Sequence, residues 1–392
     1  MNYDFDQIIN RRGTGSDKWE KYAEDVVPMW VADMDFVSPR PVVDALQSRV
    51  AQAVFGYPGE NDCLKRAIQD WLATRYDWMV DLAAIILIPG VVTGFNLASH
   101  AMRGPEGSGV LVQTPVYFPF LRAPENAGMQ RQEMELTRGP DGSYEIDVDA
   151  FEASLTDETR LFILCNPHNP VGRVFRQDEL EGIAEICLRH GVPICSDEIH
   201  GDLVFSGQRH IPLASLDPDI AAQTITLMAP SKTFNLAGLQ SSFAVIENPE
   251  LRNNFLGAKQ GLVGWVNLMG QVAALAAYES GQEWLSQLLV YLEANRDYLS
   301  EYVRTELPGI TMTKPEGTYL AWLDCSQAGI EGNPRTFFLE QAKVALSDGP
   351  AFGQGGEGFV RLNFGCPRAL LKEGLERMKT ALHASNSFGK SR

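Results

Sequence analysis

The segment ITLMAPSKTFNLAGLQSSFAVI, residues 225–246, contains a single charged side chain, that of Lys232. Apolar runs flank this lysine at 224–230 and 241–246, and both runs predict β strands. A lysine is rarely buried unless another group pairs with it or uses it. On this segment alone, a lysine stem lying along an apolar surface is an equal alternative. The segment therefore predicts either a chemically used amine at a strand end or a surface lysine.

Four further runs of β-branched and apolar residues precede this segment. They are AIILIPG (84–90), GVLVQTP (109–115), RLFILCNP (160–167) and VPICSDE (192–198). Their near-continuous apolar character predicts burial on both faces, as in a parallel sheet. Helical patterns lie between the runs, such as residues 176–191, where Gly191 is the expected C-cap. The alternation predicts an α/β layered domain.

The pattern changes near residue 262, where long helical patterns replace the alternation of strands and helices. Further along, Pro315–Gly317 has the character of a turn between two strands, and two more strands surround a glycine-rich loop. We therefore expect a smaller α+β domain at the C-terminus. The predicted division is an N-terminal arm with part of the small domain at 1–45, a large domain at 46–285 and the small domain at 286–392.

Composition limits the possible partners and location. The chain has 392 residues, 45% of them hydrophobic, and a formal net charge of −17. An acidic surface argues against a nucleic-acid or anionic-membrane partner. The six cysteines include no C-x-x-C pair, which fits a reducing compartment. The sequence lacks a signal-peptide pattern and any apolar run near the roughly 20 residues that span a bilayer, so we predict a cytoplasmic protein.

Polar and aromatic residues follow the predicted strands, at the edge where open α/β sheets place their ligands. Val92 and Thr93 open a helix after Gly90, and free amides at a helix N-terminus suit a phosphate. The other strand-end residues are Tyr117, Asn169 in NPHNPVG (166–172), Asp197 and His200 in SDEIH (196–200), and Lys232. Pyridoxal phosphate requires a lysine, a carboxylate for its pyridine nitrogen, phosphate donors and a stacked aromatic ring. Candidates for all four occur at these strand ends.

With these motifs, the chain resembles a fold-type-I pyridoxal-phosphate enzyme of the class I/II aminotransferase superfamily, within its cystathionine β-lyase (C–S lyase) branch. The resemblance covers almost the whole chain. Its other motifs are VPMWVADMDF (27–36), FGYPGEND (55–62), SKTFNLAGL (231–239) and FVRLNFGCPR (359–368). It implies an α/β fold with a large, mostly parallel sheet between helices and a smaller α+β domain, and it implies a homodimer.

The resemblance also implies roles for individual residues. Lys232 would carry the cofactor and move the Cα proton, Asp197 would pair with the pyridine nitrogen, and Arg361 would bind the substrate carboxylate. The remaining residues implied to bind the cofactor are Val92, Thr93 and Ser231 at the phosphate, Tyr117 on the ring, Asn169 at the phenolic oxygen, His200, and Tyr57 from the neighbouring subunit.

Three departures from aspartate-type transaminases favour the lyase branch or bear on activity. Gln240 stands eight residues after Lys232, where many transaminases have an arginine, and His200 stands where they have a tyrosine. Phe118 replaces a second tyrosine that is common among relatives. We expect elimination of a thiol from cystathionine or a cysteine S-conjugate, with an aminotransferase as the alternative. A cofactor-binding regulator is a third possibility, but no DNA-binding domain or basic face is visible.

Other patterns are weaker. GQGGEG (353–358) precedes a strand, whereas a dinucleotide motif follows a strand and opens a helix. The spacing of His168, His200 and His210 fits no zinc pattern, so no metal is expected. Asp33 and Asp35 alternate in an extended segment, which predicts solvent-facing and capping roles and not an acid pair.

Overall fold

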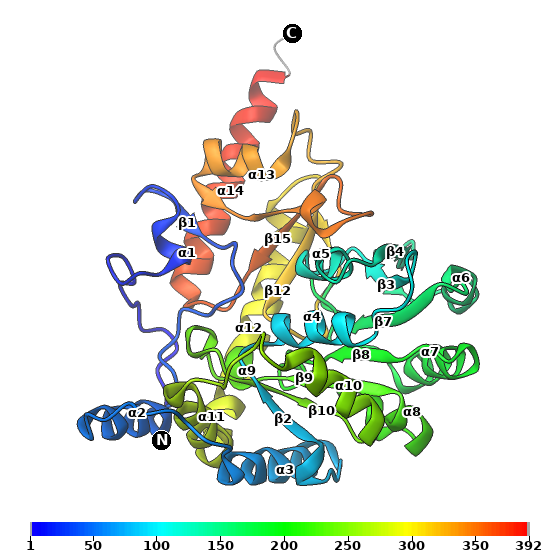
Figure 1. Cartoon of the computed structure of the whole chain (residues 1–392). Coiled ribbons are helices and arrows are strands. Elements are labelled where there is room, and N and C mark those ends of the chain that lie inside the picture. The colour runs from blue at the N-terminus through cyan, green and yellow to red at the C-terminus, as the bar shows by residue number, and fades with distance from the viewer. Residues whose placement is uncertain (1, 390–392) are drawn as a thin grey trace.

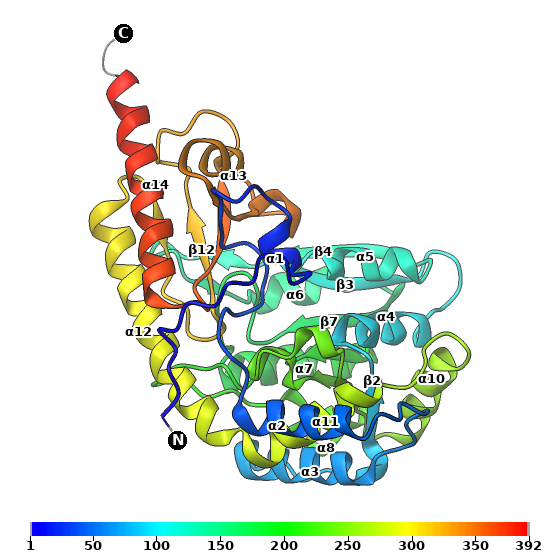
Figure 2. The same cartoon turned by 90° about the vertical axis from the view of Figure 1, so that its left-hand side faces the viewer.

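The computed structural model describes residues 2–389, with side chains through residue 385. Figure 1 shows a large sheet flanked by helices, with a smaller part above it that contains β12, β15, α13 and α14. The N-terminal segment runs alongside the smaller part before it reaches α2, and Figure 2 shows the same arrangement from the side. Within the described residues, none of the helices combines the length and apolarity that a membrane span needs.

The large sheet has seven strands in the order β2-β10-β9-β8-β7-β3-β4. They are β2 (Ile85–Ile88), β10 (Ser242–Val245), β9 (Thr224–Met228), β8 (Ile194–Asp197), β7 (Thr159–Cys165), β3 (Gly109–Thr114) and β4 (Gln130–Glu135). All six strands expected from the apolar runs are present, which confirms the predicted α/β class. The seventh, β4, was not predicted because its sequence, QRQEME, is polar, as befits a strand at the sheet edge.

One strand departs from the parallel arrangement. β10 runs antiparallel to both β2 and β9. The connection from β9 to β10 contains only the short helix α9 (Pro230–Thr233) and one 3-10 turn. A parallel crossover usually needs a longer helix, so the chain turns back and pairs in the opposite direction. This turn carries Lys232.

Helices cover both faces of the sheet, and side chains of each strand alternate between two apolar clusters. In β7, Leu161 and Ile163 pack with α4 and α5, whereas Phe162 and Leu164 pack with α6 and α7. The helices of this part are α2 (Arg40–Ala51), α3 (Asp62–Tyr76), α4 (Val91–Ala101), α5 (Pro119–Asn126), α6 (Val148–Ser154), α7 (Gln177–His190), α8 (Pro218–Ala222), α10 (Pro249–Lys259) and α11 (Leu268–Ser280). The strands β5 (Thr137–Arg138) and β6 (Tyr144–Glu145) form a small hairpin.

The smaller part contains a four-stranded sheet in the order β11-β12-β15-β14. Its elements are α12 (Gln282–Glu306), β11 (Thr311–Met312), β12 (Leu320–Asp324), α13 (Pro334–Phe337), β13 (Val344–Ala345), β14 (Ser347–Asp348), β15 (Phe359–Asn363) and α14 (Arg368–Gly389). In the N-terminal segment, α1 (Asp17–Glu20) is followed by β1 (Val27–Pro28), which pairs with β13. The domain division at residues 45 and 285 stays a prediction, and residue 285 falls inside α12.

Asn295 of α12 anchors the chain that follows β15. Its side chain is buried, and its Nδ2 donates to the carbonyls of Phe364 (3.1 Å) and Cys366 (2.8 Å). Its Oδ1 accepts a hydrogen bond from Arg368 Nε at 2.7 Å. The amide therefore fixes the end of the strand that carries Arg361.

Replacing Asn295 by leucine, which has a similar shape, should lower the free energy of unfolding by about 3 kcal/mol, because two buried carbonyls lose their donor. Urea denaturation measures the change. Asn126→Leu is the control, since Asn126 is exposed on α5, and it should change the free energy by less than about 0.5 kcal/mol. Equal changes in the two variants would show that the buried amide does not anchor the strand.

Candidate active site

A cavity of about 410 Å³ lies at the carboxyl ends of β7, β8 and β9. The parallel register pairs Cys165 with Asp197 and Asp197 with Leu227, so the loops after these strands meet at one edge. The cavity lining includes most of the residues singled out in the sequence: Val92, Thr93, Tyr117, Asn169, Asp197, His200, Ser231, Lys232 and Arg361. Tyr57 is the exception, because its side chain is fully exposed at 101%.

Lys232 stands on α9, directly after β9, and its side chain is partly buried. Its Nζ donates a hydrogen bond to the backbone carbonyl of Ala32 at 2.6 Å. Removal from solvent lowers the pKa of the amine to about 8, against a smaller opposing effect of Asp33. About a tenth of the amine is therefore unprotonated, and thus nucleophilic, at pH 7, far more than for an ordinary lysine.

Asp197 ends β8 and is buried. Burial raises the pKa of its carboxyl group to about 7, although the backbone N–H of Ile199 donates to Oδ1 at 3.0 Å and favours the charged form. A cationic ligand group beside this carboxylate would restore its ionisation. His200 lies three residues further on, and burial lowers the pKa of its imidazole to about 3, so the ring is neutral.

Arg361 projects from β15 into the same cavity and is 3% exposed. Its guanidinium donates to Asn169 Oδ1 (2.9 Å), the Trp30 carbonyl (2.9 Å) and Ser347 Oγ (3.1 Å). Within the described part of the chain, no carboxylate pairs with it, and its Nε has no partner. Burial lowers its pKa to about 10, which leaves it charged at neutral pH. A buried guanidinium without a counter-ion is costly and matches the geometry of a carboxylate ligand.

The opposite end of the cavity is formed by the N-terminus of α4. Gly90 precedes this helix with φ of 121°, and a side chain there would point into open space. The first amides of a helix have no acceptor within the helix, and Val92, Thr93 and Ser231 line this end of the cavity. Among the described lining residues, Asp197 is the only one with a carboxylate. This end therefore suits a dianionic phosphate.

These donors together fit pyridoxal phosphate. The unpartnered Nε of Arg361 and the raised pKa of Asp197 are the observations that favour a ligand in the cavity. Tyr117, whose side chain is partly buried at the cavity wall, offers an aromatic face. Asn169 uses its amide oxygen on Arg361, so its amide nitrogen would donate to the ligand.

Residues 30–32 and Ser347 also line the cavity, and the sequence did not predict this. The expected solvent-facing role of the alternating aspartates is wrong for Asp35. Its side chain is 3% exposed and forms ion pairs at 2.7 Å with both Arg11 and Lys18. The only available signal was the pair of aspartates within VPMWVADMDF, and their partners lie far away in the sequence.

Comparisons with known proteins agree with this geometry. The family model described as aminotransferase class I and II matches residues 24–378. The chain is 43% identical to cystathionine beta-lyase PatB of Bacillus subtilis, covering 96% of this chain and 99% of the relative. It is 34% identical to protein MalY of Escherichia coli, covering 97% and 99% of the two chains.

Solved structures show the same likeness. Cystalysin from Treponema denticola, which contains pyridoxal 5'-phosphate, superposes with a TM-score of 0.93 at 34% identity, over 98% of this chain and 100% of that one. A PLP-bound putative aminotransferase from Clostridium difficile has a TM-score of 0.94 at 38% identity, over 97% and 100%. These likenesses confirm the predicted fold type I architecture and the dependence on pyridoxal phosphate.

The lowered pKa of Lys232 predicts how cofactor attachment depends on pH. Pyridoxal phosphate should attach to cofactor-free protein faster as the pH rises through about 8, because the amine reacts only when it has lost its proton. Visible absorption after rapid mixing measures the rate. Lys232→Ala is the control and should show no attachment at any pH. A midpoint near 10.4, the ordinary value of a lysine, would contradict the effect of burial.

Proposed function

The chain belongs to the aminotransferase class I and II family, and on that premise we propose that it is a pyridoxal-phosphate-dependent C–S β-lyase. It cleaves L-cystathionine or related cysteine S-conjugates by α,β-elimination to a thiol, pyruvate and ammonia. One observation carries the proposal: a single cavity holds an amine of lowered pKa, a buried carboxyl and a guanidinium without a carboxylate partner. The names of the relatives above favour elimination over transamination.

Each end of the cavity has its own binding task. Val92, Thr93 and Ser231, which line the cavity, would hold the phosphate of the cofactor, and Asp197 would pair with its pyridine nitrogen. Tyr117 and His200 would contact the ring. When bound, pyridoxal phosphate supplies an electron sink that stabilises negative charge at the substrate Cα.

The protein side chains then position the substrate and move its protons. Arg361 binds the α-carboxylate and fixes the orientation of Cα. The unprotonated amine of Lys232 takes the Cα proton. The C–S bond breaks with both electrons on sulfur, and the thiolate accepts a proton. One water molecule hydrolyses the remaining three-carbon fragment to pyruvate and ammonia.

The proposal includes a homodimer in which Tyr57 reaches the phosphate of the neighbouring active site. Its support is the exposure of large apolar side chains in two segments of the single chain, 54–57 and 262–265: Val54, Phe55, Tyr57, Leu262 and Trp265. Exposed apolar side chains of this size favour an interface.

All six cysteines are free thiols, which supports the expected cytoplasmic location.

An elimination assay tests the reaction. Purified protein loaded with pyridoxal phosphate and mixed with L-cystathionine, without any keto acid, should release pyruvate and free thiol continuously. Lys232→Ala should release neither and should lack the visible absorption band of the bound cofactor. Turnover that begins only after a keto acid is added would instead show an aminotransferase on the same residues.

The dimer has its own test. Light scattering should give a mass twice the 43.3 kDa of one chain. Tyr57→Phe should weaken cofactor binding at least about tenfold while the mass stays dimeric, because a hydrogen bond to a charged phosphate is worth about 1.5–3 kcal/mol. Tyr298→Phe is the matched control, since Tyr298 lies on α12 away from the cavity. A monomer that binds the cofactor equally well in both variants would contradict the shared site.

A further inference from the structure

Residues 30–35, here called the strap, cross one wall of the cavity and touch both reactive cations through their backbone. Three successive carbonyls, those of residues 30, 31 and 32, each accept a hydrogen bond from a side chain of another part of the chain. The donors are, in order, Arg361 Nη2 (2.9 Å), Asn363 Nδ2 (2.6 Å) and Lys232 Nζ (2.6 Å). The strap therefore joins the turn after β9 to strand β15.

The strap is itself held by a cluster of four charged side chains, here called the arm cluster: Arg11, Lys18, Asp33 and Asp35. Lys18 and Asp35 are buried, whereas Arg11 and Asp33 are partly exposed. Lys18, only 1% exposed, donates to Asp35 Oδ2 at 2.7 Å and to the backbone carbonyl of Asp33 at 3.0 Å. Arg11 bridges Asp33 Oδ2 (2.8 Å) and Asp35 Oδ1 (2.7 Å). The indole of Trp19 adds a hydrogen bond to Asp35 Oδ1 at 2.8 Å.

The arm cluster contains two cations and two carboxylates, so its charges cancel. Removing Lys18 leaves two carboxylates with the single cation Arg11, and the excess negative charge beside the buried Asp35 is unfavourable. The carboxylate of Asp33 also favours the charged form of the Lys232 amine. The arm cluster thus acts on the active site in two ways: its hydrogen bonds hold the strap, and the charge of Asp33 affects the Lys232 amine.

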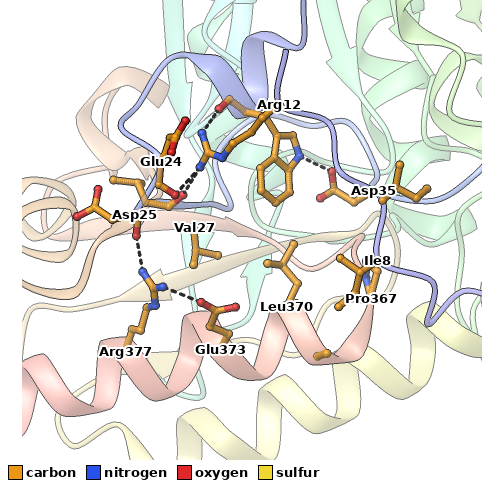
Figure 3. A pocket seen from close by; sticks show the side chains of 14 residues that line it. Ile8, Arg12, Glu24, Asp25, Val27, Asp35, Pro367, Leu370, Glu373 and Arg377 are labelled. Carbon is orange, nitrogen blue, oxygen red and sulfur yellow. Dashed lines mark hydrogen bonds and ion pairs between the residues drawn. The ribbon is translucent and has the colours of Figure 1, made fainter. Parts of the chain in front are cut away.

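A groove between the arm and α14 shows how the arm is supported. Figure 3 shows Arg12 and Arg377 directed at backbone carbonyls of the arm, with Asp35 in the same wall. Arg12 donates to the carbonyls of Trp19 (2.7 Å) and Glu24 (2.9 Å), and Arg377 donates to that of Asp25 (2.5 Å). Since both guanidinium groups are engaged with the backbone, the groove supports the arm and shows no group directed at a ligand.

We propose that Lys18 and Asp35 are positioning residues for the active site. They fix the strap so that the carbonyl of Trp30 orients the Arg361 guanidinium and the carbonyl of Ala32 orients the Lys232 amine. This inference rests on the proposed function for the identity of the ligand that Arg361 binds. Neither residue lines the cavity, so their effect on the ligand passes through the strap.

The test compares Lys18→Met with Lys314→Met in the cofactor-loaded enzyme. Both changes break a lysine–aspartate pair, but the pair of Lys314 with Asp297 is exposed. The probe is L-alanine, whose binding is followed by the visible absorption of the cofactor. The dissociation constant should rise about tenfold in Lys18→Met, since a small misplacement of binding groups has an effect of this order or more. It should stay within twofold of the wild type in Lys314→Met.

A second readout reports on the arm. Trypsin should cut the Lys18→Met enzyme after Arg11 or Arg12 several times faster than the wild type, because the arm loses its buried anchor. A purely structural role for Lys18 would lower the yield or the melting temperature without changing the dissociation constant of the folded fraction. A dissociation constant within twofold of the wild type would therefore overturn the inference.

A milder variant serves if Lys18→Met does not fold. Trp19→Phe removes the indole hydrogen bond to Asp35 while it keeps an aromatic ring beside Arg12, and it should raise the dissociation constant about threefold; no change would overturn the inference. The proposed lyase function is tested separately from the positioning role of Lys18 and Asp35. Binding of L-alanine requires no elimination, so a wild-type enzyme that binds it but releases no pyruvate from L-cystathionine contradicts only the lyase assignment.

Discussion

The withdrawal of two cations from water in one cavity is the constraint on which the rest of the structure depends. Lys232 and Arg361 respond differently, because an amine can lose its proton whereas a guanidinium cannot. Burial lowers the pKa of Lys232 to about 8, which makes a neutral amine available. Arg361, with a pKa of about 10, remains a charge that needs an anion. The same low-polarity environment therefore favours a nucleophilic amine at Lys232 and an anion-binding site at Arg361. The two outcomes differ because the two side chains differ in how readily they lose a proton.

The sheet makes this cavity possible because parallel strands end at a common edge. Hydrogen-bond register places Cys165, Asp197 and Leu227 at one level, so the loops that follow carry Asn169, His200 and Lys232 toward one another. Because β10 runs antiparallel to β9, Lys232 lies in the short turn between these two strands, next to the sheet. Arg361 lies on β15, in the four-stranded sheet of the smaller part. The strap contacts both Arg361 and the turn that contains Lys232. The side chains of Arg361 and Lys232 are therefore linked through the backbone carbonyls of Trp30 and Ala32.

Much of this arrangement could be predicted from the sequence, and the misses have physical reasons. Continuous apolar runs identified six strands, and their polar ends identified Asp197 and Lys232, because strand ends of a parallel sheet converge. β4 was missed because an edge strand needs no apolar pattern. The direction of β10 depends on the length of a turn, which periodicity does not reveal. Lys18 was missed because it stands in a polar stretch, GSDKWEK, and is buried only by contacts with residues 15 and 17 positions away. Tyr57 needs a second chain, and its role stays a prediction.

The charge balance of the cavity explains why an acidic protein binds anionic ligands. The chain carries a net charge of −17, yet the described cavity lining has two cations, Lys232 and Arg361, against the single carboxylate of Asp197. The imidazole of His200 adds no charge, because burial lowers its pKa to about 3. Gln240 is uncharged as well, so the phosphate end relies on helix amides and hydroxyl groups. On the proposed function, a phosphate at α4 and a carboxylate at Arg361 would supply the missing negative charge. Lys232 is the lining amine whose lowered pKa allows it to exchange a proton near neutral pH.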